Sequence, residues 1–106
     1  MAWTYLLLAG VAEIGWPLGL KLGWTQDGIR WPWIGVAVAC IGVSGGLLLL
    51  AQRQIPMGTA YAVWTGIGAV GTFALGIVAY GDPASSLRIA SAGLIVAGVV
   101  GLKVFG

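Results

Sequence analysis

The chain alternates between long apolar stretches and short polar breaks, and this pattern sets the expected secondary structure. Apolar stretches cover residues 2–20, 33–51, 57–80 and 85–105, each close to the length of about 20 residues that a helix needs to cross a bilayer. The breaks carry most of the charged residues, and the first one contains Asp27-Gly28, a turn signal. The pattern predicts an all-α membrane protein with four transmembrane helices, forming one domain over residues 1–106.

The composition supports a lipid environment. The sequence is 59% hydrophobic and 8% charged, whereas a soluble domain carries about 25% charged residues. The net charge of +2 is small and scattered, so we expect no nucleic-acid partner. Cys40 is the only cysteine and histidine is absent, which removes disulfides, thiol clusters and the usual metal ligand and proton shuttle. We therefore expect no metal and no cofactor.

A single carboxylate lies inside the first apolar stretch. Between Met1 and Leu20, Glu13 is the only side chain that carries a charge. A charge at bilayer depth costs about 2.5 to 3.5 kcal/mol on insertion scales, so such residues usually serve a function. We interpret Glu13 as a binding site for protons or cations, with a purely structural hydrogen bond as the alternative. No nucleophile, base and orienting group can be assembled from the sequence, so we do not expect an enzyme.

The helical period places a candidate pocket wall around this carboxylate. Gly10, Glu13, Pro17 and Leu20 share one helical face, and Trp16 lies beside Glu13. A proline lacks the N–H that would bond to the carbonyl four residues earlier, and that carbonyl belongs to Glu13. The sequence therefore predicts a helix kink at Pro17, next to the candidate site.

Two further stretches supply candidate pocket residues. Ser44 is the polar exception in the second stretch, and it either bonds its own backbone or orients a buried carboxylate. In the third stretch Tyr61 and Trp64 share a face that Gly68 and Gly71 continue without side chains. Aromatic rings attract organic cations, although an interfacial role is the alternative and fits Tyr61 better than Trp64.

Small residues at helical spacing predict close packing. Gly15, Gly19 and Gly23 recur every fourth residue in and just after the first stretch and permit close helix approach. The fourth stretch has no polar group in its middle, so we assign it to packing between subunits. Its candidate packing residues are Gly93, Ala97, Gly98 and Gly101.

The basic residues give no strong orientation signal. With four spans, Arg53 and Lys103 lie on the side of the termini, against Lys21, Arg30 and Arg88 on the other side. Lysine and arginine bias sets membrane topology, so this near balance is compatible with insertion in both orientations. We therefore expect an antiparallel homodimer of dual topology, a two-chain version of an inverted repeat.

These residues resemble the small multidrug resistance transporters over essentially the whole chain. The marks of that resemblance are Glu13, Leu20-Lys21, Pro56-x-Gly58-Thr59-Ala60-Tyr61-Ala62-Val63-Trp64-Thr65-Gly66 and Gly81-Asp82-Pro83. Trp16, together with Trp64-Thr65-Gly66-Ile67-Gly68-Ala69-Val70-Gly71, is similar to the guanidinium-exporter subgroup. Pro17 departs from the small non-proline residue expected there.

The resemblance implies a function and a site. It implies a proton-coupled antiporter of guanidinium and small guanidinyl cations in the bacterial inner membrane, working as an antiparallel homodimer. Glu13 of both subunits would bind substrate or protons in competition, with Trp16 and Ser44 as its hydrogen-bond donors and Tyr61 and Trp64 as walls.

Three alternatives remain at the level of the sequence. One is a polyspecific exporter of hydrophobic quaternary ammonium or substituted guanidinium compounds, and another is one half of an obligate heterodimer. The third is a structural or regulatory membrane subunit that transports nothing, a function that leaves Glu13 unexplained.

Overall fold

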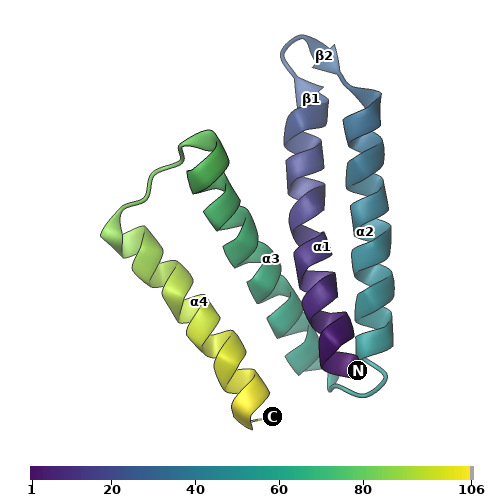
Figure 1. The fold of residues 1–106 in the computed structure, drawn as a ribbon, viewed down its shortest axis with the longest axis vertical. Helices are drawn as coiled ribbons and strands as arrows, with labels where there is room; N and C mark the ends of the chain where they lie inside the picture. The colour runs from purple at the N-terminus through teal and green to yellow at the C-terminus, as the bar shows by residue number, and fades with distance from the viewer. Residues whose placement is uncertain (106) are drawn as a thin grey trace.

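The computed structural model describes residues 1–105, which form four long helices joined by short connections (Figure 1). Their bounds are α1 Ala2–Gly23, α2 Trp31–Ala51, α3 Met57–Tyr80 and α4 Ser86–Phe105. Within the described residues, all four are long and apolar enough to cross a membrane. The expectation of an all-α membrane protein with four spanning helices is thus confirmed.

The first connection contains a small β-hairpin that the hydrophobic pattern did not predict. Strand β1, Trp24–Thr25, pairs antiparallel with β2, Gly28–Ile29. Gly28 has a φ of 123°, and the Thr25 hydroxyl donates a hydrogen bond to its carbonyl at 2.8 Å. The Asp27-Gly28 turn signal is therefore real, but strands of this length are too short to leave an alternating pattern.

The helix ends at this connection also differ from the predicted bounds. Helix α1 continues past residue 20 to Gly23, and α2 already begins at Trp31, before the predicted start at residue 33. Pro32 fits into the first turn of α2 because no N–H is needed from that position. At Pro17, α1 continues as one helix, and the kink stays a prediction.

Helices α1 and α2 form the closest pair in the fold. The predicted role of Gly15, Gly19 and Gly23 is confirmed, because side chains there would collide with α2. A Cβ atom on Gly19 would lie 2.9 Å from the backbone nitrogen of Ala37, and one on Gly15 would overlap the sulfur of Cys40. Missing side chains thus let the two backbones approach.

The buried core lies near the chain termini, where α1 meets the end of α2 and the start of α3 (Figure 1). Its members are small or aliphatic side chains: Ala2, Leu6, Ala51, Ile55, Ala60 and Val63. Helix α3 runs beside α1 and carries α4 on its other side. No residue of α4 is buried within the described chain.

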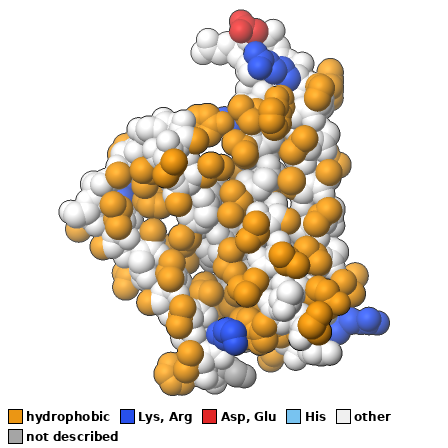
Figure 2. All heavy atoms as spheres, viewed as in Figure 1, with side chains coloured by type: hydrophobic (Ala, Val, Ile, Leu, Met, Phe, Trp, Pro, Cys, Tyr) orange, Lys and Arg blue, Asp and Glu red, His pale blue; other side chains and the backbone are white. Residues whose placement is uncertain are grey.

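The outer surface matches a bilayer environment. Figure 2 shows apolar side chains over the visible face, with the Lys, Arg and Asp/Glu side chains gathered toward its two ends. Both termini lie at the same end of the bundle (Figure 1). Large apolar side chains such as Leu8, Val38, Leu94 and Val100 are more than half exposed. Lipid contact accounts for these exposed side chains.

Candidate functional site

Glu13 projects from α1 toward the bare backbone of α3. A Cβ atom placed on Gly68 would lie 2.7 Å from Glu13 Cγ, so any larger residue at that position would displace the carboxylate. The predicted glycine face of α3 therefore has a defined purpose, because it makes room for the single acidic side chain of the helix pair.

Both oxygens of the Glu13 carboxylate have a neighbouring side-chain donor. The Trp16 indole N–H, one turn further along α1, donates to Oε1. The Ser44 hydroxyl, from α2, lies 3.0 Å from Oε2. Hydrogen bonds to an ionised group are the stronger ones, so this pair holds the carboxylate in one orientation between the helices.

Ser44 lies on the side of the carboxylate away from the cavity and is fully buried, 0% exposed. Its hydroxyl oxygen lies 2.8 Å from the Ala9 carbonyl oxygen and accepts a hydrogen bond from Trp64 Nε1 at 2.7 Å. A hydroxyl has one proton, so it donates either to Glu13 or to Ala9. The arrangement satisfies an ionised Glu13, to which Ser44 donates, and a protonated Glu13, from which Ser44 accepts.

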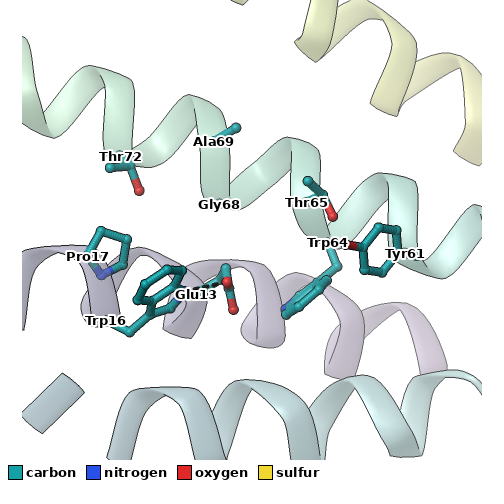
Figure 3. Close-up of a pocket in the computed structure, with 9 residues that line it drawn as sticks. All are labelled: Glu13, Trp16, Pro17, Tyr61, Trp64, Thr65, Gly68, Ala69 and Thr72. Carbon is teal, nitrogen blue, oxygen red and sulfur yellow. Dashed lines mark hydrogen bonds between the residues drawn. The ribbon is translucent and has the colours of Figure 1, made fainter. Parts of the chain in front are cut away.

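A cavity of about 380 Å³ opens between α1 and α3 in front of this carboxylate (Figure 3). Its size lies within the range of small-molecule sites. The Tyr61 and Trp64 rings flank one end, with centroids 5.3 Å apart and planes tilted by 51°. The residues lining the cavity are Glu13, Trp16, Pro17, Tyr61, Trp64, Thr65, Gly68, Ala69 and Thr72.

The structure thus brings the predicted site residues together from three helices. Glu13, Trp16, Tyr61 and Trp64 line the cavity, and Ser44 supports the carboxylate from behind. Pro17, predicted as a kink, also lines it. In contrast, the small residues of α4 lie elsewhere, and around Gly93, Gly98 and Gly101 there is open space.

Sequence reasoning missed Thr65, Ala69 and Thr72 as lining residues. Their spacing of four and three residues places them on one helical face, which is the signal that could have identified them. Which face of α3 meets α1, however, depends on how the two helices pack.

The chemistry of the site is that of one negative charge among rings and hydroxyls. Within residues 1–105, no group of three or more His, Cys, Asp or Glu residues could hold a metal ion. A single carboxylate can bind a proton or a monovalent cation, and nearby rings favour an organic cation.

Comparison with known proteins supplies the family. Residues 1–95 match the family described as Small Multidrug Resistance protein. The protein named "Guanidinium exporter" of Citrobacter freundii is 48% identical over 103 residues, covering 97% of this chain and 96% of that relative. The "Guanidinium exporter" of Yersinia pestis is 50% identical over 103 residues, covering 97% of each chain. With the four apolar helices and the cavity around Glu13, these matches establish that the chain belongs to the small multidrug resistance family.

Proposed function

We propose that this protein exports guanidinium and small guanidinyl cations in exchange for protons, and that both compete for Glu13. Two relatives that are 48% and 50% identical over nearly the whole chain are named guanidinium exporters, which supports the substrate class. Membership of a transporter family agrees with the expectation that the chain is not an enzyme.

The observation that carries this proposal is the carboxylate of Glu13 at the cavity between α1 and α3. Guanidinium is planar, weakly hydrated and offers a fork of N–H donors that matches a carboxylate in bidentate geometry. Its flat faces stack on aromatic rings, and Trp16, Tyr61 and Trp64 line the same cavity. Charge, shape and ring surface therefore suit one small planar cation.

The coupling of cation export to protons follows from the single negative charge of Glu13. A protonated Glu13 is neutral and loses its attraction for a cation, whereas a bound cation keeps the carboxylate ionised. Ser44 offers a hydrogen-bond partner to either form. If the transporter changes its open side only when loaded with one or the other, the proton gradient drives export of the cation.

We further propose that the transporter is an antiparallel homodimer in the bacterial inner membrane. The cavity lies open beside α1 and α3, and one such bundle offers a single carboxylate to it. A second, inverted copy would close the cavity and supply a second Glu13. Helix α4, with no buried residue, offers Gly93, Ala97, Gly98 and Gly101 as its contact surface.

Polyspecific export is the second candidate. The cavity of about 380 Å³ has room for more than a bare guanidinium ion, which favours some tolerance of larger cations. Bulky quaternary ammonium ions carry no N–H donors, so they would forgo the bidentate contact with Glu13.

The test is proton-coupled current in liposomes that contain only this protein. Guanidinium is compared with tetrapropylammonium, and Glu13→Gln is the control that keeps the side-chain shape without the charge. We expect current with guanidinium, little with tetrapropylammonium, and none from Glu13→Gln. Equal currents for the two cations would establish the polyspecific candidate instead. A Glu13→Gln protein that still exchanges guanidinium for protons would refute the proposal.

A further inference from the structure

The cavity continues past Glu13 toward the end of α1 that leads into the β1–β2 hairpin. Pro17 and Thr72 line this part of the cavity. Gly68 of α3 faces Glu13, and Gly71 faces Ile14. Helices α1 and α3 therefore run side by side in the same direction here. Four residues further along each helix, Pro17 and Thr72 come to the same level, as Figure 3 shows. That level lies about 6 Å beyond the carboxylate along the helix axis.

The polar group at this end of the cavity is a threonine hydroxyl. The Thr72 hydroxyl points from α3 toward α1 (Figure 3), and a hydroxyl both donates and accepts hydrogen bonds. On the opposite wall Pro17 has no N–H, so it cannot occupy the Glu13 carbonyl as a normal helical residue would. Between these walls the cavity is lined by Gly68 and Ala69, small residues that take up little of its volume.

The other end of the cavity is already filled by aromatic rings. Tyr61 and Trp64 stand there with their ring centroids 5.3 Å apart, and the Trp64 indole N–H is taken by Ser44. A substituent on a guanidinium ion held by Glu13 would meet these rings on one side. On the side of Thr72 it would meet the hydroxyl of that residue, with Trp16 and Pro17 on the facing wall.

From this asymmetry, and resting on the proposed function, we infer that Thr72 is a specificity-determining residue. The cavity takes monosubstituted guanidinium cations whose substituent ends in a hydrogen-bonding group. The guanidinium lies on Glu13 and the substituent extends toward the Thr72 hydroxyl. The distance of about one helical turn corresponds to a substituent of roughly three to five bonds.

The test compares two cations of the same size, 2-hydroxyethylguanidinium and n-propylguanidinium, which differ by a hydroxyl in place of a methyl group. Uptake into liposomes is measured for wild type, Thr72→Val, which is isosteric and lacks the hydroxyl, and Thr72→Ser, which retains it. The readout is the ratio of kcat/KM for the hydroxyethyl compound to that for the propyl compound. Thr65→Val removes the other threonine hydroxyl that lines the cavity, at the end with the Tyr61 and Trp64 rings, and is the matched control.

We expect this ratio to fall about fivefold in Thr72→Val, as for the loss of one neutral hydrogen bond. It should stay at the wild-type value in Thr72→Ser and in Thr65→Val. If Thr72→Val does not give folded protein, Thr72→Ala removes the same hydroxyl and decides by the same ratio.

A ratio that Thr72→Val leaves unchanged, or that Thr65→Val lowers equally, would overturn the inference. Failure of the proposed function itself has a different signature, because wild-type protein would then transport no guanidinium compound at all.

Discussion

The α1–α2 pair and helix α4 use the same small residues in opposite ways. A Cβ atom on Gly19 of α1 would lie 2.9 Å from the backbone of Ala37, whereas one on Gly98 of α4 would meet nothing within 4 Å. Ser44 of α2 is fully buried in a network between helices, whereas Ser91 of α4 is exposed and bonds the Leu87 carbonyl of its own helix at 2.8 Å.

The α1–α2 pair and α4 therefore differ in what their small residues pack against. In the α1–α2 pair the small residues are used within the chain, and the close approach they permit positions Ser44 against Glu13. In α4 the same kinds of residue are not buried by the rest of the chain, and their remaining surface contacts lipid or a second chain. A glycine pattern alone therefore does not say whether a contact lies within or between subunits.

The largest effect is expected from a side chain added inside the α1–α2 pair. Gly19→Val places a branched side chain against the Ala37 backbone, which cannot move aside as a flexible side chain could. We expect it to destabilise the fold by about 3 kcal/mol or more, the upper range for overpacking. Denaturant unfolding of the purified protein in detergent measures this.

The control for this variant is Gly42→Val, on the open face of α2, where an added Cβ meets nothing within 4 Å. Its unfolding free energy should stay within about 0.5 kcal/mol of wild type. If both variants were destabilised equally, the close contact of Gly19 with Ala37 would not be the cause of the destabilisation.

Next in size is the loss of the buried serine. Ser44→Ala removes a partner from Glu13 and leaves the Trp64 indole N–H without its acceptor. We expect guanidinium transport to fall at least about tenfold, as for leaving buried polar groups unsatisfied. Ser91→Ala is the matched control, because it removes an exposed hydroxyl bonded to its own helix, and its transport should remain near wild type.

A smaller effect should appear when the outward face of α4 is filled. Gly98→Leu adds a side chain where this chain offers no contact, so helix content and the fold of one chain should persist. If α4 packs on a second copy, the dimer should weaken about tenfold. Cross-linking in liposomes at a series of protein-to-lipid ratios measures the dimer fraction. An unchanged fraction would mean that this face of α4 contacts lipid.

The smallest effect concerns the contact that ties the end of α4 to α1. The Lys103 ammonium lies 4.9 Å from the centre of the Trp3 ring, a cation–π contact of about 0.5 to 1 kcal/mol at an exposed site. Lys103→Met keeps the aliphatic stem without the charge and should lower the unfolding free energy by that amount. Lys103→Arg preserves the cation and should retain stability. A loss of equal size from Lys103→Arg would argue against a contribution from the charge.

Much of the fold and the core of the site could be predicted from the sequence. The cost of a charge in lipid singled out Glu13, and the helical period placed Trp16 next to it and Trp64 on a shared face with Gly68. These inferences need only local spacing and the chemistry of one residue. Ser44 stood out as the polar residue of an apolar stretch with two possible roles, and the resemblance to a known family favoured the role of a partner of the carboxylate.

What the sequence could not predict depends on how the helices pack. Thr72 became a lining residue only once Gly68 was seen to face Glu13, which fixes the register of α3 against α1. The Ala9 carbonyl, a partner of Ser44, carries no side-chain signal. The β1–β2 hairpin was not predicted, because its strands are Trp24–Thr25 and Gly28–Ile29. Each strand covers a single period of apolar–polar alternation, which is too little for a pattern to be recognised.

The central claim is that protons and substrate share one carboxylate, and proton release on binding tests it most directly. Guanidinium is added to purified protein in weakly buffered detergent solution, at a pH where Glu13 is largely protonated, and the released protons are titrated. The account predicts proton release by wild type and none by Glu13→Gln, with apparent affinity for guanidinium increasing as the pH rises. Guanidinium binding without proton release, and with an affinity independent of pH, would contradict it.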